Sequence, residues 1–195
     1  MLQYVSKNLT DKLIYYKIID SGMADIYQYG FELWLSTLLT SSTILLVACL
    51  MDSLFFGFLY FCITIPLRMT TGGYHSPTYS GCFLISNATY IAVSLLTKYL
   101  SALIMYYSFW FVLLSGSTLY ILANCPVKNP HHPVSAKVLK KNRLIAILYL
   151  LILCYLMVLF YIMLQQSYIL NFIVITVLSV AILILPTKSR KEDPK

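Results

Sequence analysis

Long apolar stretches alternate with short polar ones along almost the whole chain. A helix must have about 20 mostly apolar residues to cross a hydrocarbon core of about 30 Å. Six stretches approach or reach that length, and they cover residues 33–50, 53–67, 82–97, 99–123, 144–164 and 168–186. The second and third are short and end in polar residues, so either is expected to tilt, re-enter or span. The pattern predicts an all-α, polytopic integral membrane protein with about six transmembrane or re-entrant helices.

The first residues follow a different pattern. Apolar side chains recur there at intervals of three and four positions, at Leu2, Val5, Leu9, Leu13 and Tyr16. This spacing is typical of an amphipathic helix. We expect residues 2–20 to form an N-terminal interfacial helix on the inner membrane surface. A turn should follow at Asp20-Ser21-Gly22, before the chain enters the first crossing.

No internal repeat divides the chain, so we expect one membrane domain over residues 1–195. We expect an amphipathic N-terminal region at 1–30 and membrane helices within 33–186. Between the second and third apolar runs lies a polar island at 68–82. A cytoplasmic loop is expected at 124–143 and a charged cytoplasmic tail at 187–195.

Composition and charge support a membrane location. The chain is 59% hydrophobic and 11% charged, with a mean hydropathy of +0.78 and a net charge of +7. If the N-terminus is cytoplasmic and all six runs cross, every Lys and Arg except Lys98 lies inside, as the positive-inside rule requires. A four-crossing version, with 53–67 and 82–97 as a re-entrant pair, gives the same sidedness. Topology and anionic lipid explain the excess charge, so no nucleic-acid partner is expected.

The polar island reads RMTTGGYHSPTYSGC from Arg68 to Cys82. Ionisable groups at a bilayer edge are costly and usually mark function. Two glycines and Pro77 disfavour a regular helix through the island. On one helix, His75 and Cys82 would lie about 10.5 Å apart along the axis, too far for direct proton transfer. We therefore expect a glycine-hinged loop that folds back over the start of the next helix.

Cys82 has two means of activation in this arrangement. It follows Ser80-Gly81, an expected helix cap, so its sulfur should lie in the first turn of a helix. The positive end of the helix dipole favours a thiolate there. His75 would supply a nearby base, and a nucleophile with a base is the minimum set for covalent acyl transfer. Backbone amides near residues 81–83 are the expected oxyanion donors.

Other residues support or compete with this interpretation. Arg68 either anchors a carboxylate or snorkels to phosphate head groups. Glu32 begins the first crossing at the same depth, where it would pair with Arg68 or orient His75. The loop at 124–143 has two possible roles. Its positive charge either only fixes the membrane topology or also attracts an anionic partner, through Lys137, Lys140, Lys141 and Arg143.

Two alternative functions are open. The first is a zinc site, because five residues are permissible zinc ligands: His75, Cys82, Cys125, His131 and His132. None of them has the tight spacing typical of zinc sites. We expect no metal and no cofactor, and we expect Cys49, Cys62 and Cys154 to fill space within apolar runs. The other alternative is a small transporter or binding protein with a re-entrant gate at 68–82. Few charged groups lie within the crossings, which disfavours a transporter.

The island also carries a family resemblance. Arg68, Gly72-Gly73, His75 and Cys82, in this order and spacing within a chain of six apolar runs, resemble the accessory gene regulator B family, the AgrB-type membrane peptidases of Gram-positive quorum sensing. The stretch from Cys125-Pro126-Val127 to Pro133 is similar to the family's proline-bearing cytoplasmic loop. It departs from the family at His131-His132-Pro133, where relatives often carry an asparagine-lysine-proline step.

The resemblance implies a membrane-embedded cysteine endopeptidase of the bacterial plasma membrane, with both termini cytoplasmic. It would cleave an AgrD-type precursor peptide through a thioester on Cys82 and promote cyclisation to a thiolactone or lactone autoinducer. His75 would be the general base, and Arg68, Gly72 and Gly73 would be supporting positions. The implied partners are the precursor and membrane lipid, and a homodimer is left open.

Overall fold

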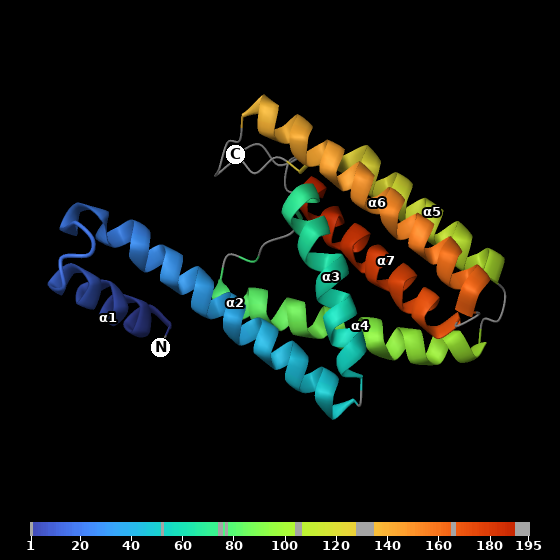
Figure 1. Cartoon of the computed structure of the whole chain (residues 1–195), viewed down its shortest axis with the longest axis horizontal. Coiled ribbons are helices and arrows are strands. Elements are labelled where there is room, and N and C mark those ends of the chain that lie inside the picture. The colour runs from blue at the N-terminus through green and yellow to red at the C-terminus, as the bar shows by residue number, and fades with distance from the viewer. Residues whose placement is uncertain are drawn as a thin grey trace.

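The protein is described here by a computed structural model, which covers residues 2–51, 53–73, 76, 78–103, 107–127, 135–164 and 167–189. Within these residues the regular structure is helical, which confirms the predicted all-α class. Figure 1 shows the arrangement of α1 (Leu2–Tyr15), η1 (Ser21–Met23), α2 (Ala24–Leu50), α3 (Leu54–Thr71), α4 (Tyr79–Leu103), α5 (Tyr107–Asn124), α6 (Ala136–Leu164) and α7 (Ser167–Ser189).

The six predicted apolar runs correspond to α2 through α7. In the described part of the chain, five helices are long and apolar enough to cross a membrane, over Ser21–Leu50, Leu54–Thr71, Tyr79–Ser101, Ala136–Leu159 and Tyr168–Leu185. α5 contributes a shorter apolar helix, Ser108–Asn124.

One predicted boundary is wrong. Lys98 was expected in a short connection between the third and fourth runs, but α4 continues through it to Leu103, and α5 begins at Tyr107. Lysine is a good helix former, and no proline or glycine stands nearby to end the helix. Its side chain is exposed at this position. A long side chain can reach the interface from within a helix, so one lysine does not mark a helix end.

α7 forms the centre of the bundle, and α3, α4, α5 and α6 pack around it (Figure 1). Within its apolar window, 61% of α7 is buried, against 39% for α3 and 17% for α2. The surrounding helices direct many apolar side chains outward, as expected where lipid takes the place of water. α7 therefore provides the surface on which the other helices are aligned.

Contacts between distant segments identify the two ends of the bundle. At one end, the Val127 amide after α5 donates a hydrogen bond of 2.9 Å to the Thr71 carbonyl at the end of α3. At the other end, a cavity of 190 Å³ gathers Met51 and Ser53 with Lys98 of α4 and Tyr168 of α7. α3 connects these two ends, and the second half of α4 lies at the second of them.

α1 is shorter than the amphipathic stripe suggested. It ends at Tyr15, because Lys17 adopts a left-handed conformation with φ of 54°. The Ile18 amide then donates to the Leu13 carbonyl at 2.9 Å, in the 6→1 pattern that ends many helices. α1 lies alongside the first half of α2 (Figure 1) and buries Ser6 and Thr10. The apolar stripe stays partly exposed beside that contact.

A proline inside α3 is compensated by α6. Pro66 has no amide hydrogen, so the carbonyl of Cys62 loses its normal helical donor. The Tyr149 hydroxyl of α6 donates a hydrogen bond to that carbonyl. In an apolar environment an unpaired carbonyl costs several kcal/mol, so this bond fixes α3 against α6.

Tyr149→Phe should lower the stability of the folded protein by about 1–3 kcal/mol, because it leaves the Cys62 carbonyl unpaired. Thermal unfolding in detergent measures the loss. Tyr155→Phe, at an exposed position of the same helix, is the matched control and should change little. In a Pro66→Ala background the Tyr149→Phe cost should shrink, because the alanine amide restores the helical donor. An equal loss of stability in both backgrounds would show that the Tyr149 hydrogen bond does not replace the helical donor that Pro66 lacks.

Candidate active site

Thr78 caps the helix that carries Cys82. The Gly81 amide donates to the Thr78 hydroxyl at 3.2 Å, and the Cys82 amide donates to the Thr78 carbonyl at 3.0 Å. This is the usual geometry of a threonine N-cap, with its side chain accepting from the third helical residue. The expected cap at Ser80-Gly81 is therefore wrong by two residues. The half-buried Cys82 does lie at the helix start, at its fourth residue.

The cap changes which amides are free for catalysis. The amides of Gly81 and Cys82 are already bonded to Thr78, so they are not oxyanion donors. Tyr79 and Ser80 are the first two residues of α4, and amides at those positions have no carbonyl acceptor inside a helix. The available donors are thus shifted toward the loop, away from the predicted 81–83.

Ser76, between α3 and α4, packs against this first turn. The glycine-hinged loop that would bring His75 to Cys82 stays a prediction. A methyl group on Gly81 would clash with the side chain of Ser76 and would reach within 3.0 Å of the Thr78 hydroxyl. Ser76 can pack there only because residue 81 has no side chain. Its hydroxyl also accepts a hydrogen bond of 3.4 Å from the Thr78 amide. Ser76 therefore contacts the residue that immediately precedes Cys82. His75 lies outside the described residues.

Glu32 is a buried carboxylate that connects α1 to α2. It is only 7% exposed. The Ser6 hydroxyl of α1 and the Gln28 amide of α2 donate to its Oε1 atom at 3.3 and 3.2 Å, and the Tyr79 side chain at the start of α4 lies near it. The two hydrogen bonds hold α1 against α2, and the first turn of α4 lies beside this contact. The predicted pairing with Arg68 or His75 remains a prediction.

Gly72 and Gly73 end α3 and meet the start of the cytoplasmic loop. Gly72 has a φ of +74°, and a methyl group there would lie 3.3 Å from Val127. A methyl group on Gly73, whose φ is +152°, would lie 3.8 Å from the Leu183 carbonyl of α7. Both positions have a backbone conformation that favours glycine, and Gly72 also has a close neighbour. The two sequence segments that carry the family resemblance, around 72 and around 125, are thus in direct contact.

The remaining supporting residues lie at the same end. Arg68 is half-buried in the last turn of α3, and its carbonyl accepts from the Gly72 amide at 3.0 Å. The cations expected in the 124–143 loop lie instead in the first two turns of α6, where all four are exposed: Lys137, Lys140, Lys141 and Arg143. The described part of the chain has no group of three potential metal ligands. His131, His132 and Pro133 lie outside it, with His75.

Cys125 has a different environment from Cys82. It is buried after α5, and its sulfur lies 3.8 Å from the Thr70 carbonyl. Burial raises the pKa of Cys125 to about 11, against the opposing effect of the nearby Arg143 guanidinium. A neutral thiol is a poor nucleophile. Cys125 therefore serves packing at this corner.

A groove opens beside the first turn of α4. It has a volume of 880 Å³ and is lined by Leu2, Gln3 and Val5 of α1, by Leu35, Leu38, Leu39 and Ser42 of α2, and by Thr78, Tyr79 and Ser80. Cys82 follows Thr78 and Tyr79 by four and three positions, so the three residues share a helix face. The groove therefore adjoins the turn that carries Cys82.

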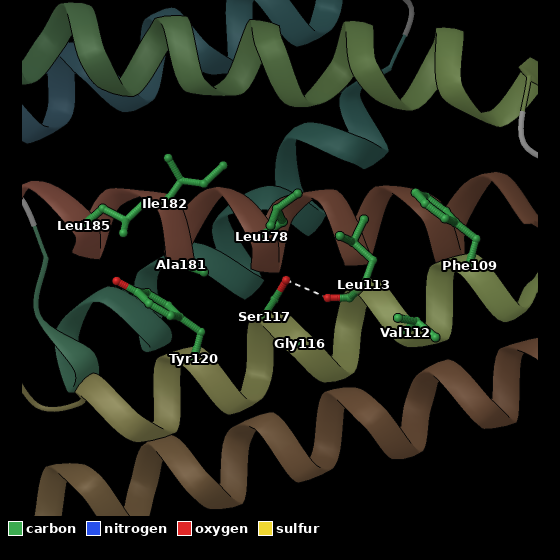
Figure 2. Close-up of a pocket in the computed structure, with 10 residues that line it drawn as sticks. All are labelled: Phe109, Val112, Leu113, Gly116, Ser117, Tyr120, Leu178, Ala181, Ile182 and Leu185. Atoms are coloured by element: carbon green, nitrogen blue, oxygen red, sulfur yellow. Dashed lines mark hydrogen bonds between the residues drawn. The ribbon is translucent and has the colours of Figure 1, made fainter.

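A second cavity, of 340 Å³, lies between α5 and α7 and contains none of the predicted site residues (Figure 2). Figure 2 shows mainly apolar side chains around it, with the Ser117 hydroxyl donating to the Leu113 carbonyl of its own helix at 2.7 Å. Its lining offers no base and no thiol. It is therefore not the candidate active site.

Sequence reasoning did not find Ser6, Ser76 or Tyr79. Ser6 and Tyr79 lie near Glu32, which is distant in sequence, and Ser76 packs where Gly81 has no side chain. Contacts of these two kinds produce no periodic pattern in the sequence. Thr78 could have been found, because threonine is a favoured cap, but Ser80 satisfied the same rule.

Comparison with known proteins gives one match. The family model for accessory gene regulator B matches residues 6–184, nearly the whole chain. No curated protein and no solved structure matches the chain.

Gly81→Ala should reduce the turnover of any reaction that uses Cys82 by about 10- to 100-fold, because the added methyl group displaces Ser76 from the first turn of α4. Alanine favours the helix, so thermal stability in detergent should not fall in parallel. Adding Ser76→Gly removes the clash and should restore part of the turnover. Undiminished turnover in Gly81→Ala would contradict the role given to the loop contact.

Cys125 should react slowly with iodoacetamide at pH 8, because a thiol with a pKa near 11 is thiolate in only about one part in a thousand there. Its rate should rise as the pH increases toward 11. Peptide-resolved mass spectrometry gives the rates for Cys125 and Cys82 in one sample, and the denatured protein provides the control. Equal rates in the folded protein at pH 8 would contradict this assignment.

Proposed function

Because the chain belongs to the accessory gene regulator B family, and therefore takes part in quorum-sensing peptide processing at the membrane, we propose that it is a cysteine endopeptidase in which Cys82 is the nucleophile. The observation that carries the proposal is the position of Cys82 in a Thr78-capped first turn, against which the loop packs through Ser76 and Gly81. His75, next to Ser76 in sequence, is the proposed general base.

The proposed reaction begins with proton transfer from the Cys82 thiol to His75. The sulfur attacks the scissile carbonyl carbon, and the tetrahedral intermediate collapses with cleavage of the carbon–nitrogen bond. The leaving amine takes the proton from His75, and the N-terminal part of the precursor remains as a thioester on Cys82. The amides of Tyr79 and Ser80, at the positive end of the α4 dipole, are the proposed donors to the oxyanion.

Ring formation completes the proposed cycle. A thiol or hydroxyl within the bound precursor attacks the thioester carbonyl, gives its proton to the departing Cys82 sulfur by way of His75, and forms a thiolactone or lactone. Exchange of one thioester for another changes little bond energy, so the first cleavage carries the main barrier. A site at the membrane edge excludes water, which would otherwise hydrolyse the intermediate.

Charge supports the placement of this site on the cytoplasmic side, with both termini inside. The exposed cations at the start of α6 lie at the same end of the bundle as Gly72 and Val127. They would attract acidic residues of a precursor. Arg68, half-buried at that end, would bind a carboxylate or orient the loop.

Cys82→Ala and His75→Ala should each abolish cleavage of the precursor by the purified protein in lipid vesicles. The substrate is a synthetic peptide with the sequence of the small reading frame expected beside this gene, which should contain one cysteine or serine before a charged end. Cys62→Ala, at an exposed position of α3, is the matched control and should cleave normally. Peptide transport that survives both active-site changes, without cleavage, would instead support the transporter.

A further inference from the structure

The groove beside Cys82 has a defined location and no role in the reaction as written above. We propose that it binds an apolar segment of the precursor peptide directly adjacent to the scissile bond, an inference that rests on the proposed function. The groove lies between α1, α2 and the start of α4, and its volume of 880 Å³ is within the range of about 300–1,000 Å³ typical of ligand sites.

The three walls of the groove differ in character. The α1 wall has Leu2 and Val5 with Gln3, and the α2 wall has three leucines, Leu35, Leu38 and Leu39, with Ser42. At the end formed by α4, the lining consists of Thr78, Tyr79 and Ser80. Apolar side chains of a ligand fit the α1 and α2 walls, and hydrogen-bonding groups of a ligand fit the α4 end.

This combination favours a peptide over a lipid tail. A peptide bond must leave helical structure to be cleaved, and in apolar surroundings its exposed amide and carbonyl groups then need partners. The hydroxyls of Thr78 and Ser80 and the first amides of α4 supply such partners beside Cys82. An acyl chain would fill the leucine-lined part but would leave the polar end unused.

The walls of the groove are held in place before any ligand binds. Glu32 accepts hydrogen bonds from Ser6 of α1 and from Gln28 of α2, and Tyr79 lies near it. The carboxylate thus fixes the α1 wall relative to α2, next to the α4 end of the groove. A preformed groove lowers the entropy cost of ordering a flexible peptide.

The test is a bulky substitution in the leucine-lined part. Leu38 is 50% exposed and lines the groove, so Leu38→Trp fills space without disturbing the core. The KM for the synthetic precursor should rise about tenfold or more, while the rate of Cys82 alkylation by iodoacetamide stays unchanged. Leu46→Trp, on the same helix at 60% exposure and outside the groove lining, is the control and should keep the wild-type KM.

A second measurement does not need cleavage. The synthetic precursor carries a benzophenone side chain next to the scissile bond and is irradiated with the Cys82→Ala variant in vesicles. Cross-links to residues 35–42 of α2 or to the start of α1 support the groove. Cross-links to residues 78–80 at the start of α4 are compatible with the groove, whereas cross-links confined to α3, α5, α6 or α7, or a wild-type KM in Leu38→Trp, overturn it and indicate a lipid-filled groove. Failure of the proposed function itself would be seen in a different result, namely precursor cleavage that persists in the Cys82→Ala variant.

Discussion

Backbone groups near a membrane must be hydrogen-bonded within the protein, because lipid offers no partners. The described structure meets this constraint at the points where helices are interrupted. Tyr149 pairs with the carbonyl that Pro66 leaves free, Thr78 caps the start of α4, and Val127 pairs with the end of α3. Two of these three contacts lie in the candidate site, so the site and the fold depend on the same requirement.

The candidate site has two parts at one end of the bundle. In one part, glycines at the end of α3 allow the segment after α5 and the end of α7 to approach closely. In the other, Glu32 joins α1 to α2 through hydrogen bonds from Ser6 and Gln28, next to Tyr79 at the start of α4. Ser76 lies between the two parts in sequence, and Gly81 allows it to pack against the helix that carries Cys82. A cleavage reaction needs both, because the loop carries the proposed base and the groove would hold the peptide.

Much of this architecture could be predicted from sequence. The apolar runs located α2 to α7, and the glycines of the island located the hinge, because both are local patterns. The prediction of a helix end at Lys98 was wrong because a lysine alone does not end a helix. The predicted cap of α4 was wrong because Thr78 and Ser80 are equally good cap candidates by residue type. The contacts Ser76 with Gly81, Glu32 with Tyr79, and Tyr149 with Cys62 could not be predicted, since they join segments only in three dimensions.

The central claim is that Cys82 forms a covalent thioester with the precursor. The most direct measurement is mass spectrometry of the intact protein, quenched with acid during turnover of the synthetic precursor and then digested to locate the adduct. The account predicts the mass of the N-terminal precursor fragment on the peptide that contains Cys82, removable by hydroxylamine and missing from His75→Ala. An adduct on another cysteine, or turnover with no covalent intermediate under conditions that slow its release, would contradict it.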